Sequence, residues 1–225
     1  MSKKAIILFS GGLDSTTCLA IAKDQGFEPC LFSVFYGQKH QAELNAAKRI
    51  AKHFEVKIHK ILEFPEGFFS CSALIDPDWP VPDATGSKDI PPTYVPARNT
   101  IFLSHALGFA EMIGSSDLFY GASCVDYSGY PDCRPEYIKA FEKMANLATK
   151  SAVEGTPVFI HTPLMHLSKA ETIKKGLALC VDYSMTVSCY RADVQGRACG
   201  TCDSCAFRKK GFLEAGVEDV TRYVN

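Results

Sequence analysis

Near its start the chain has a short apolar run that leads directly into a turn with two adjacent glycines. Residues 5–9 are apolar, residues 10–15 read Ser-Gly-Gly-Leu-Asp-Ser, and a helix-like stretch covers residues 16–25. A buried strand that ends in a glycine turn and enters a helix brings backbone N–H groups to one point, where they hold an anion. Glycine fits there because it has no Cβ, so it adopts positive φ and lets the backbone approach a ligand. The pattern therefore predicts an α/β fold with an anion-binding loop after its first strand.

The side chains of this loop suit phosphate and magnesium. Ser10, Ser15 and Thr16 add hydroxyl donors, and Asp14 offers a hard oxygen ligand for Mg²⁺. No Lys precedes the Ser/Thr as in a Walker loop, and the G-x-G-x-x-G spacing of dinucleotide folds is absent. On the glycines alone, an ordinary turn is the alternative. The whole pattern is more specific and resembles the pyrophosphate-binding loop of the N-type ATP pyrophosphatases, which adenylate a carboxylate or carbonyl oxygen.

Strand-like and helix-like patterns continue to alternate along the chain. Further strands are expected at residues 30–35, 56–62 and 117–121, and further helices at 40–54, 99–113, 136–150 and 168–179. This alternation predicts a doubly wound parallel sheet with helices on both faces. In such sheets ligands lie beyond the carboxyl ends of the strands, which is where the glycine loop falls.

Two stretches stand apart from this alternation. Residues 64–92 have no periodicity and contain six prolines, and they are predicted to form a mobile flap near the site rather than an inert surface excursion. The last part of the chain is rich in cysteine. We expect an ATP-binding α/β domain at residues 1–185 and a small zinc-binding region packed on it at residues 186–225.

The overall composition narrows the partners and the compartment. The net charge of −1 gives no basic field for nucleic acid, so none is expected as a partner. No apolar run reaches 18 residues, and the N-terminal one is too short for a secretion signal, so a cytoplasmic protein without a membrane span is predicted.

Four of the ten cysteines form a regular cluster in the sequence. Cys189, Cys199, Cys202 and Cys205 give the spacing Cys-x9-Cys-x2-Cys-x2-Cys, which suits a tetrahedral Zn²⁺ site. Four protein ligands leave the metal no open position, so a structural role is predicted. An iron–sulfur cluster, a redox Cys-x-x-Cys and unrelated free thiols are the alternatives. The scattered cysteines are expected mostly in the core.

Several motifs follow the glycine loop in a fixed order. They are Phe-Tyr-Gly-Gln-Lys-His-Gln-Ala-Glu-Leu at 35–44, Tyr-Val-Pro-Ala-Arg-Asn at 94–99, Asp-Tyr-Ser-Gly-Tyr-Pro-Asp-Cys-Arg at 126–134, Thr-Pro-Leu at 162–164 and Leu-Ser-Lys-Ala-Glu-Thr-Ile at 167–173. Together with the four cysteines, they resemble the QueC family of 7-cyano-7-deazaguanine synthases over nearly the whole chain.

This resemblance implies a fold, a reaction and a nucleotide site. The fold would be that of the adenine nucleotide alpha hydrolases. The reaction would be an ATP-dependent ligation of 7-carboxy-7-deazaguanine with ammonia, through an adenylated carboxylate and an adenylated amide, to the nitrile used in queuosine biosynthesis. Mg²⁺ would accompany ATP, and the chain would form a homodimer. The expected ATP-binding residues are Phe9, Ser10, Gly11, Gly12, Leu13, Asp14, Ser15, Thr16, Thr17, Cys18 and Leu19.

Catalytic and substrate-binding residues are expected in the same motifs. Asp14 and Lys169 are the catalytic candidates, although Lys169 could be a solvated lysine at a helix end. A guanine-like base presents an N1–H beside an exocyclic amine, which a single carboxylate accepts together. The substrate-binding candidates are Arg98, Asp126, Tyr130, Asp132 and Arg134: a carboxylate for the base, a ring for stacking and a guanidinium for the substrate carboxylate. A surface loop at 126–134 and a structural ion pair of Arg98 are the alternatives.

Two other functions fit part of the pattern. A tRNA-modifying ATP pyrophosphatase would need an RNA-binding surface, against which the charge argues. A non-catalytic zinc-ribbon protein on a nucleotide-binding scaffold would bind ATP without turning it over.

Overall fold

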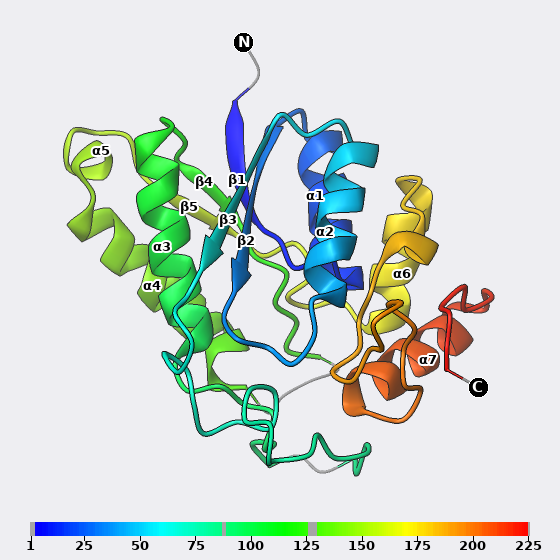
Figure 1. Ribbon diagram of the computed structural model, residues 1–225. Coiled ribbons are helices and arrows are strands. Elements are labelled where there is room, and N and C mark those ends of the chain that lie inside the picture. The colour runs from blue at the N-terminus through cyan, green and yellow to red at the C-terminus, as the bar shows by residue number, and fades with distance from the viewer. Residues whose placement is uncertain (1–2, 87–88, 126–129, 225) are drawn as a thin grey trace.

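The computed structural model describes residues 3–86, 89–125 and 130–224. Helices and strands alternate along the chain (Figure 1). Their order is β1 (Lys4–Leu8), α1 (Leu13–Asp24), β2 (Glu28–Phe35), α2 (Ala42–His53), β3 (Ile58–Glu63), α3 (Arg98–Met112), β4 (Asp117–Phe119), η1 (Pro131–Cys133), α4 (Pro135–Ala148), α5 (Lys150–Val153), β5 (Phe159–His161), α6 (Lys169–Ala178), η2 (Tyr183–Met185) and α7 (Asp203–Ala215).

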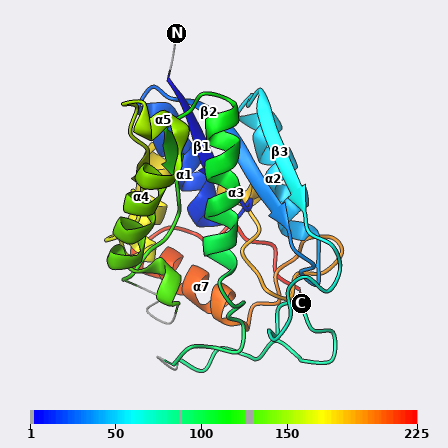
Figure 2. The ribbon, with the colours of Figure 1, turned by 90° about the vertical axis from the view of Figure 1, so that its left-hand side faces the viewer.

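The strands form one parallel sheet in the order β3-β2-β1-β4-β5. The side chains of β1 alternate between its two faces, as the period of two in a strand requires. Ile7 packs with the core that α1 and α2 complete, whereas Ile6 packs with the core of α3 and α4. Figure 2 shows α3 and α4 lying across the second face. The predicted doubly wound parallel sheet is confirmed.

A third, smaller core joins the C-terminal region to the sheet domain. It contains buried residues of α1, α6, the α6–η2 connection, η2 and α7, namely Leu13, Ala20, Ile173, Val181, Tyr183 and Phe212. A Cβ on Gly211 would lie 2.4 Å from the Cγ of Lys169, so this glycine allows α7 to pass close to the start of α6. The C-terminal region therefore packs on the same end of the molecule as the glycine loop. The division at residue 185 into two units stays a prediction.

The sequence prediction missed some elements and joined others. The helix expected at 136–150 is broken at Thr149, whose extended backbone ends α4 and begins α5. The short strand β5 and the helix α7 were not predicted, and the strand expected at 117–121 ends at Phe119. The remaining predicted elements are confirmed, with ends that differ by a few residues. Among the described residues, no helix is both long and apolar enough to cross a bilayer.

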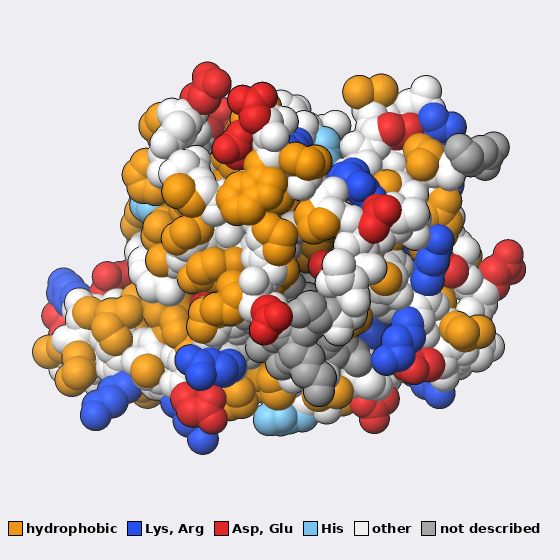
Figure 3. Space-filling view, turned by 90° about the horizontal axis from the view of Figure 1, so that it is seen from below, with side chains coloured by type: hydrophobic (Ala, Val, Ile, Leu, Met, Phe, Trp, Pro, Cys, Tyr) orange, Lys and Arg blue, Asp and Glu red, His pale blue; other side chains and the backbone are white. Residues whose placement is uncertain are grey.

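The described residues of the 64–92 segment contain no helix or strand, as predicted, but the segment is packed. Phe69, Ala73, Leu74 and Val81 are buried in the core that α1 and α2 complete. Phe68, Trp79 and Ile90 of the segment are exposed, and Figure 3 shows hydrophobic side chains gathered on this lower face. The segment thus packs on the core through one side and has an apolar outer surface, and its movement as a flap stays a prediction.

Candidate active site

The glycine loop connects β1 to α1 and leaves a helix N-terminus open. Gly11 has φ +84°, and a Cβ there would lie 2.5 Å from the backbone nitrogen of Ala47, so only glycine fits. Gly12 is the N-cap residue of α1, and no side chain of its own caps the helix. The first N–H groups of a helix have no partner within it. The Leu13 N–H donates to the Ser188 hydroxyl at 2.9 Å, and the next N–H groups of α1 are available to an anion.

Hydroxyl groups hold the loop in shape. The Ser10 hydroxyl accepts a hydrogen bond from the Gly12 N–H at 3.2 Å and lies 3.1 Å from the Ser15 hydroxyl. The Thr16 hydroxyl donates to the Gly12 carbonyl at 2.8 Å. Buried hydroxyls that satisfy loop backbone groups fix the direction of the remaining N–H groups. The sequence predicted these hydroxyls as donors to phosphate; here they bond within the loop, and their contact with phosphate stays a prediction.

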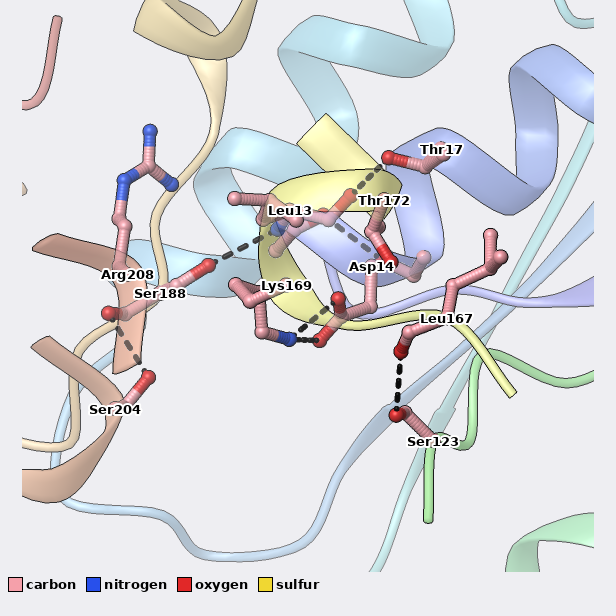
Figure 4. A network of polar contacts seen from close by, with 12 residues as sticks. Leu13, Asp14, Thr17, Ser123, Leu167, Lys169, Thr172, Ser188, Ser204 and Arg208 are labelled. Carbon is pink, nitrogen blue, oxygen red and sulfur yellow. Dashed lines mark hydrogen bonds and ion pairs between the residues drawn. The ribbon is translucent and has the colours of Figure 1, made fainter. Parts of the chain in front are cut away.

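Asp14 and Lys169, the two predicted catalytic residues, form an ion pair. The Lys169 Nζ donates to both carboxylate oxygens of Asp14, at 2.7 and 2.8 Å. The two residues come from the first turns of α1 and α6, which the chain separates by 155 residues. Figure 4 shows the Lys169 side chain directed at the Asp14 carboxylate. A lysine at a helix N-terminus opposes the helix dipole, so its position depends on its partner and on the capping box of Ser168 and Glu171.

A cavity of about 340 Å³ opens beside this pair. It lies beyond the carboxyl ends of β1, β2 and β4 and is lined by Phe9, Tyr36 and Tyr120, which follow these strands. Its volume falls at the lower end of the range of small-molecule sites. The two carboxylates that line it are Asp14 and Glu43, among the residues that the structure describes. Asp14 marks the phosphate end of the cavity, and Arg98 and Tyr130 line its other part.

The predicted substrate-binding residues do not all reach this cavity. Arg98 and Tyr130 line it, and Arg98 donates through Nη1 to the Tyr36 hydroxyl at 3.1 Å. Asp132 and Arg134 do not line it: Asp132 is buried, and Arg134 donates to the Pro131 carbonyl at 3.0 Å.

Asp126, the remaining substrate-binding candidate, lies outside the described residues. Tyr130, which follows it in the same motif, has its hydroxyl 3.0 Å from the Thr93 hydroxyl. Among the described residues of this motif, Tyr130 and Cys133 line the cavity.

Glu43, the second residue of α2, was not predicted as a site residue. Burial raises the pKa of the Glu43 carboxyl from its ordinary value of 4.5 to about 7, although the Arg98 guanidinium acts to lower it. A carboxyl that titrates near neutrality and faces a cavity is suited to proton transfer. No local pattern singled out Glu43, which lies between the buried Ala42 and Leu44 on an amphipathic helix. The cavity beside it is visible only in three dimensions.

The four predicted cysteine ligands come together below the cavity. Their Sγ atoms all lie within 4.8 Å of one another, and those of Cys199 and Cys205 are 3.9 Å apart. A tetrahedral zinc ion with Zn–S bonds of about 2.3 Å needs sulfur separations of roughly 3.8 Å, so the cluster fits the metal. The Cys189 Sγ also accepts hydrogen bonds from the N–H groups of Arg191 and Cys199, as thiolates in metal sites do.

A parallel sheet with a Ser-Gly-Gly-x-Asp-Ser loop at the carboxyl end of its first strand defines a nucleotide-binding protein of the PP-loop class. The family model described as "Queuosine biosynthesis protein QueC" matches residues 4–216. The chain belongs to the QueC family.

Relatives in three bacteria are similar over nearly their whole length, and each is named 7-cyano-7-deazaguanine synthase. The protein of Coxiella burnetii (strain RSA 331 / Henzerling II) is 60% identical, with 99% of this chain and 98% of its own covered. That of Legionella pneumophila (strain Corby) is 59% identical, with 98% of this chain and 97% of its own covered. That of Dechloromonas aromatica (strain RCB) is 60% identical, with 99% of each covered.

Among solved structures, an NMN synthetase from Francisella tularensis is similar at a TM-score of 0.48 and 12% identity, with 97% of this chain and 79% of the other covered. Because that score is below 0.5, the fold assignment rests on the sheet topology described above.

Proposed function

We propose that the chain is a 7-cyano-7-deazaguanine synthase, an ATP-dependent ligase of queuosine biosynthesis. Its substrates would be 7-carboxy-7-deazaguanine, ammonia and two molecules of ATP. The observation that carries the proposal is the Asp14–Lys169 pair at the open N-terminus of α1, facing a cavity in a member of the QueC family. The full-length similarity to the relatives that carry this name supports it.

The chemistry explains why two ATP molecules are needed. A carboxylate must lose both oxygens to become a nitrile, and neither oxygen leaves unaided. Attack of the carboxylate on the α-phosphorus of ATP releases pyrophosphate, and ammonia then displaces AMP to give the amide. The amide oxygen attacks a second ATP in the same way. Loss of AMP and of both protons on the nitrogen then leaves the carbon–nitrogen triple bond.

The phosphate end of the cavity is suited to the adenylation step, in which ATP releases pyrophosphate. The N–H groups at the start of α1 and the Lys169 ammonium face the place where the β- and γ-phosphates would lie. A carboxylate has more acceptor sites than the Lys169 ammonium occupies, so Asp14 can hold Mg²⁺ as well. The ion, when bound, offsets the charge that develops on the departing pyrophosphate.

The other end of the cavity would bind the deazaguanine. Arg98 is the candidate for orienting the substrate carboxylate, and Tyr130 for packing on the ring. Glu43 is the candidate for accepting protons from ammonium and from the activated amide, since its carboxyl faces the cavity and makes no hydrogen bond to another described residue. Asp132 lies behind the lining, so a contact with the base would require the 130–134 segment to move.

The remaining parts of the proposal concern the metal and the assembly. Zinc at the four cysteines would be structural, because they leave it no open position. Ammonia, either free or delivered by another protein, would serve as the nitrogen donor, in the cytoplasm. The apolar lower face of the 64–92 segment supports a homodimer, because exposed apolar patches commonly mark interfaces.

Product analysis tests the proposed reaction. The protein is incubated with 7-carboxy-7-deazaguanine, ammonium, Mg²⁺ and ATP, and the products are identified by mass spectrometry. The proposal predicts the nitrile together with AMP and pyrophosphate. AMP formation that requires tRNA and yields no nitrile would favour a tRNA-modifying enzyme, and the absence of ATP turnover would favour a binding protein.

A further inference from the structure

The segment that leads into the first cysteine ligand lies against the phosphate loop. The Val187 N–H donates to the Gly11 carbonyl at 3.1 Å, and the Ser188 hydroxyl accepts from the Leu13 N–H at 2.9 Å. Leu13 is the first residue of α1, and Figure 4 shows the Ser188 side chain reaching its backbone. A Cβ on Gly12 would lie 3.2 Å from the Ser188 Oγ, so glycine at this position leaves room for the hydroxyl. The C-terminal region therefore forms part of the loop's surroundings.

The Ser188 hydroxyl has a hydrogen left to donate. A serine hydroxyl carries one O–H and two lone pairs, and the Leu13 N–H uses one of the lone pairs. The hydroxyl makes no other hydrogen bond to the described residues, and Ser188 lines the cavity. Its O–H is thus free to point at an anion that sits at the start of α1, where the next N–H groups also point.

The cysteine cluster holds Ser188 in this position from both sides. Cys189 follows it directly, and the Ser204 hydroxyl, between two other cysteine ligands, donates to the Ser188 carbonyl at 3.0 Å. The His40 Nε2 lies 2.8 Å from the Cys189 carbonyl and links the same stretch to the β2–α2 connection. Metal binding at the cysteines would order this stretch, because a metal couples its ligands to the fold around them.

We propose that Ser188 is a phosphate-binding residue of the ATP site, supplied by the cysteine region. Its hydroxyl oxygen accepts a hydrogen bond from the Leu13 N–H, and its O–H donates to a phosphate oxygen of the nucleotide. This inference rests on the proposed function, because it takes ATP as the anion. It gives the cysteine region a direct share in nucleotide binding, in addition to its part in stability.

The competing explanation is that Ser188 only caps α1. A hydroxyl that satisfies the first N–H of a helix stabilises the fold by about 1 kcal/mol, whether or not a ligand binds. Removing a cap lowers thermal stability and leaves the affinity for nucleotide unchanged. Removing a ligand contact lowers the affinity, and a hydrogen bond to a charged group is worth about tenfold or more in affinity.

Titration calorimetry with MgATP tests the inference on the zinc-loaded protein without the other substrates. Ser188→Ala and Ser188→Thr are compared with the wild type and with Ser184→Ala, whose exposed hydroxyl donates to Asp182 at 2.6 Å and does not line the cavity. Zinc content and Tm are measured on the same samples. We expect about a tenfold weaker affinity for MgATP in Ser188→Ala, with unchanged zinc content. Ser188→Thr should recover most of the loss, and Ser184→Ala should behave as the wild type.

Three results would overturn the inference. Unchanged affinity in Ser188→Ala with a lowered Tm would reduce the residue to a helix cap. A loss of affinity that merely follows a loss of zinc would show that the hydroxyl makes no contact of its own. A wild-type protein that binds no MgATP would overturn the inference and the proposed function together, whereas the first two results leave the proposed function standing.

Discussion

The two ends of the cavity are built in different ways. At the phosphate end, a strand, a tight loop and two helix N-termini place Asp14 and Lys169 within 2.8 Å of each other. At the base end, Arg98 begins α3 after a long irregular segment, and Tyr130 directly precedes the short η1. Regular elements hold their side chains by main-chain hydrogen bonds, whereas loops depend on side-chain packing. We therefore expect the phosphate end to be rigid and intolerant of change, and the base end to adapt to its ligand.

The largest effect should follow from a change at the phosphate end. Asp14→Asn should lower kcat/KM for nitrile formation by about 10³-fold, because an amide cannot replace a carboxylate beside Mg²⁺ and Lys169. Asp24→Asn, at the exposed end of the same helix, is the matched control and should keep full activity. Steady-state kinetics and Tm measure both. Normal turnover of Asp14→Asn at ordinary Mg²⁺ would remove Asp14 from the site.

Loss of a cysteine ligand should affect stability before activity. Cys202→Ser should lower Tm by about 10 °C and reduce the bound zinc below the roughly one ion per chain expected for the wild type. Cys71→Ser, at an exposed thiol of the 64–92 segment, should change neither. Elemental analysis measures the bound zinc, and scanning calorimetry measures Tm. A Cys202→Ser protein with full zinc and Tm but without turnover would indicate a catalytic metal.

Glu43 lines the same cavity and predicts a pH dependence of stability. Its pKa of about 7 in the folded protein exceeds 4.5, so the folded state binds more protons between these values and loses stability as the pH rises through them. Glu43→Gln removes this loss, so at pH 8 it should be more stable than the wild type by about 3 kcal/mol, and nearly equal to it near pH 4.5.

Kinetics of the same variant test the proposed role of Glu43. The wild-type kcat should fall as the pH drops below about 7, because the protonated carboxyl cannot accept a proton. In Glu43→Gln, kcat should be low and should no longer change in that range. A variant with normal kcat and a raised KM for the deazaguanine would instead make Glu43 a base-binding residue.

The smallest effect is expected at the base end. Arg98→Gln should raise the KM for 7-carboxy-7-deazaguanine about tenfold and leave the affinity for MgATP unchanged. Arg134→Gln is the control, because its guanidinium bonds to the Pro131 carbonyl outside the cavity. Equal effects of the two changes would mean that the 130–134 segment moves onto the substrate. A loss of ATP affinity in Arg98→Gln would mean that the nucleotide binds at the base end of the cavity.

The contrast between the two ends also explains what the sequence could reveal. The glycine loop with Asp14 and the four cysteines form local patterns, because short-range spacing decides their chemistry. Lys169 was predicted from the family resemblance of its motif, and only the fold brings it to Asp14, 155 residues away. Glu43 and Ser188 face the cavity only through the packing of distant segments, so no local pattern marks them as functional. Asp132 shows the opposite case: its type suited the base, but the fold buries it behind Tyr120. The three-residue β5 carried too little periodicity to predict.

An isotope experiment tests the central claim most directly. The substrate carboxylate is labelled with ¹⁸O in both oxygens, and the AMP released is analysed by mass spectrometry alongside the nitrile. Two successive adenylations predict two AMP molecules per nitrile, each with one ¹⁸O atom. One AMP per nitrile, or AMP without the label, would contradict the assignment of the cavity to adenylation of the substrate oxygens.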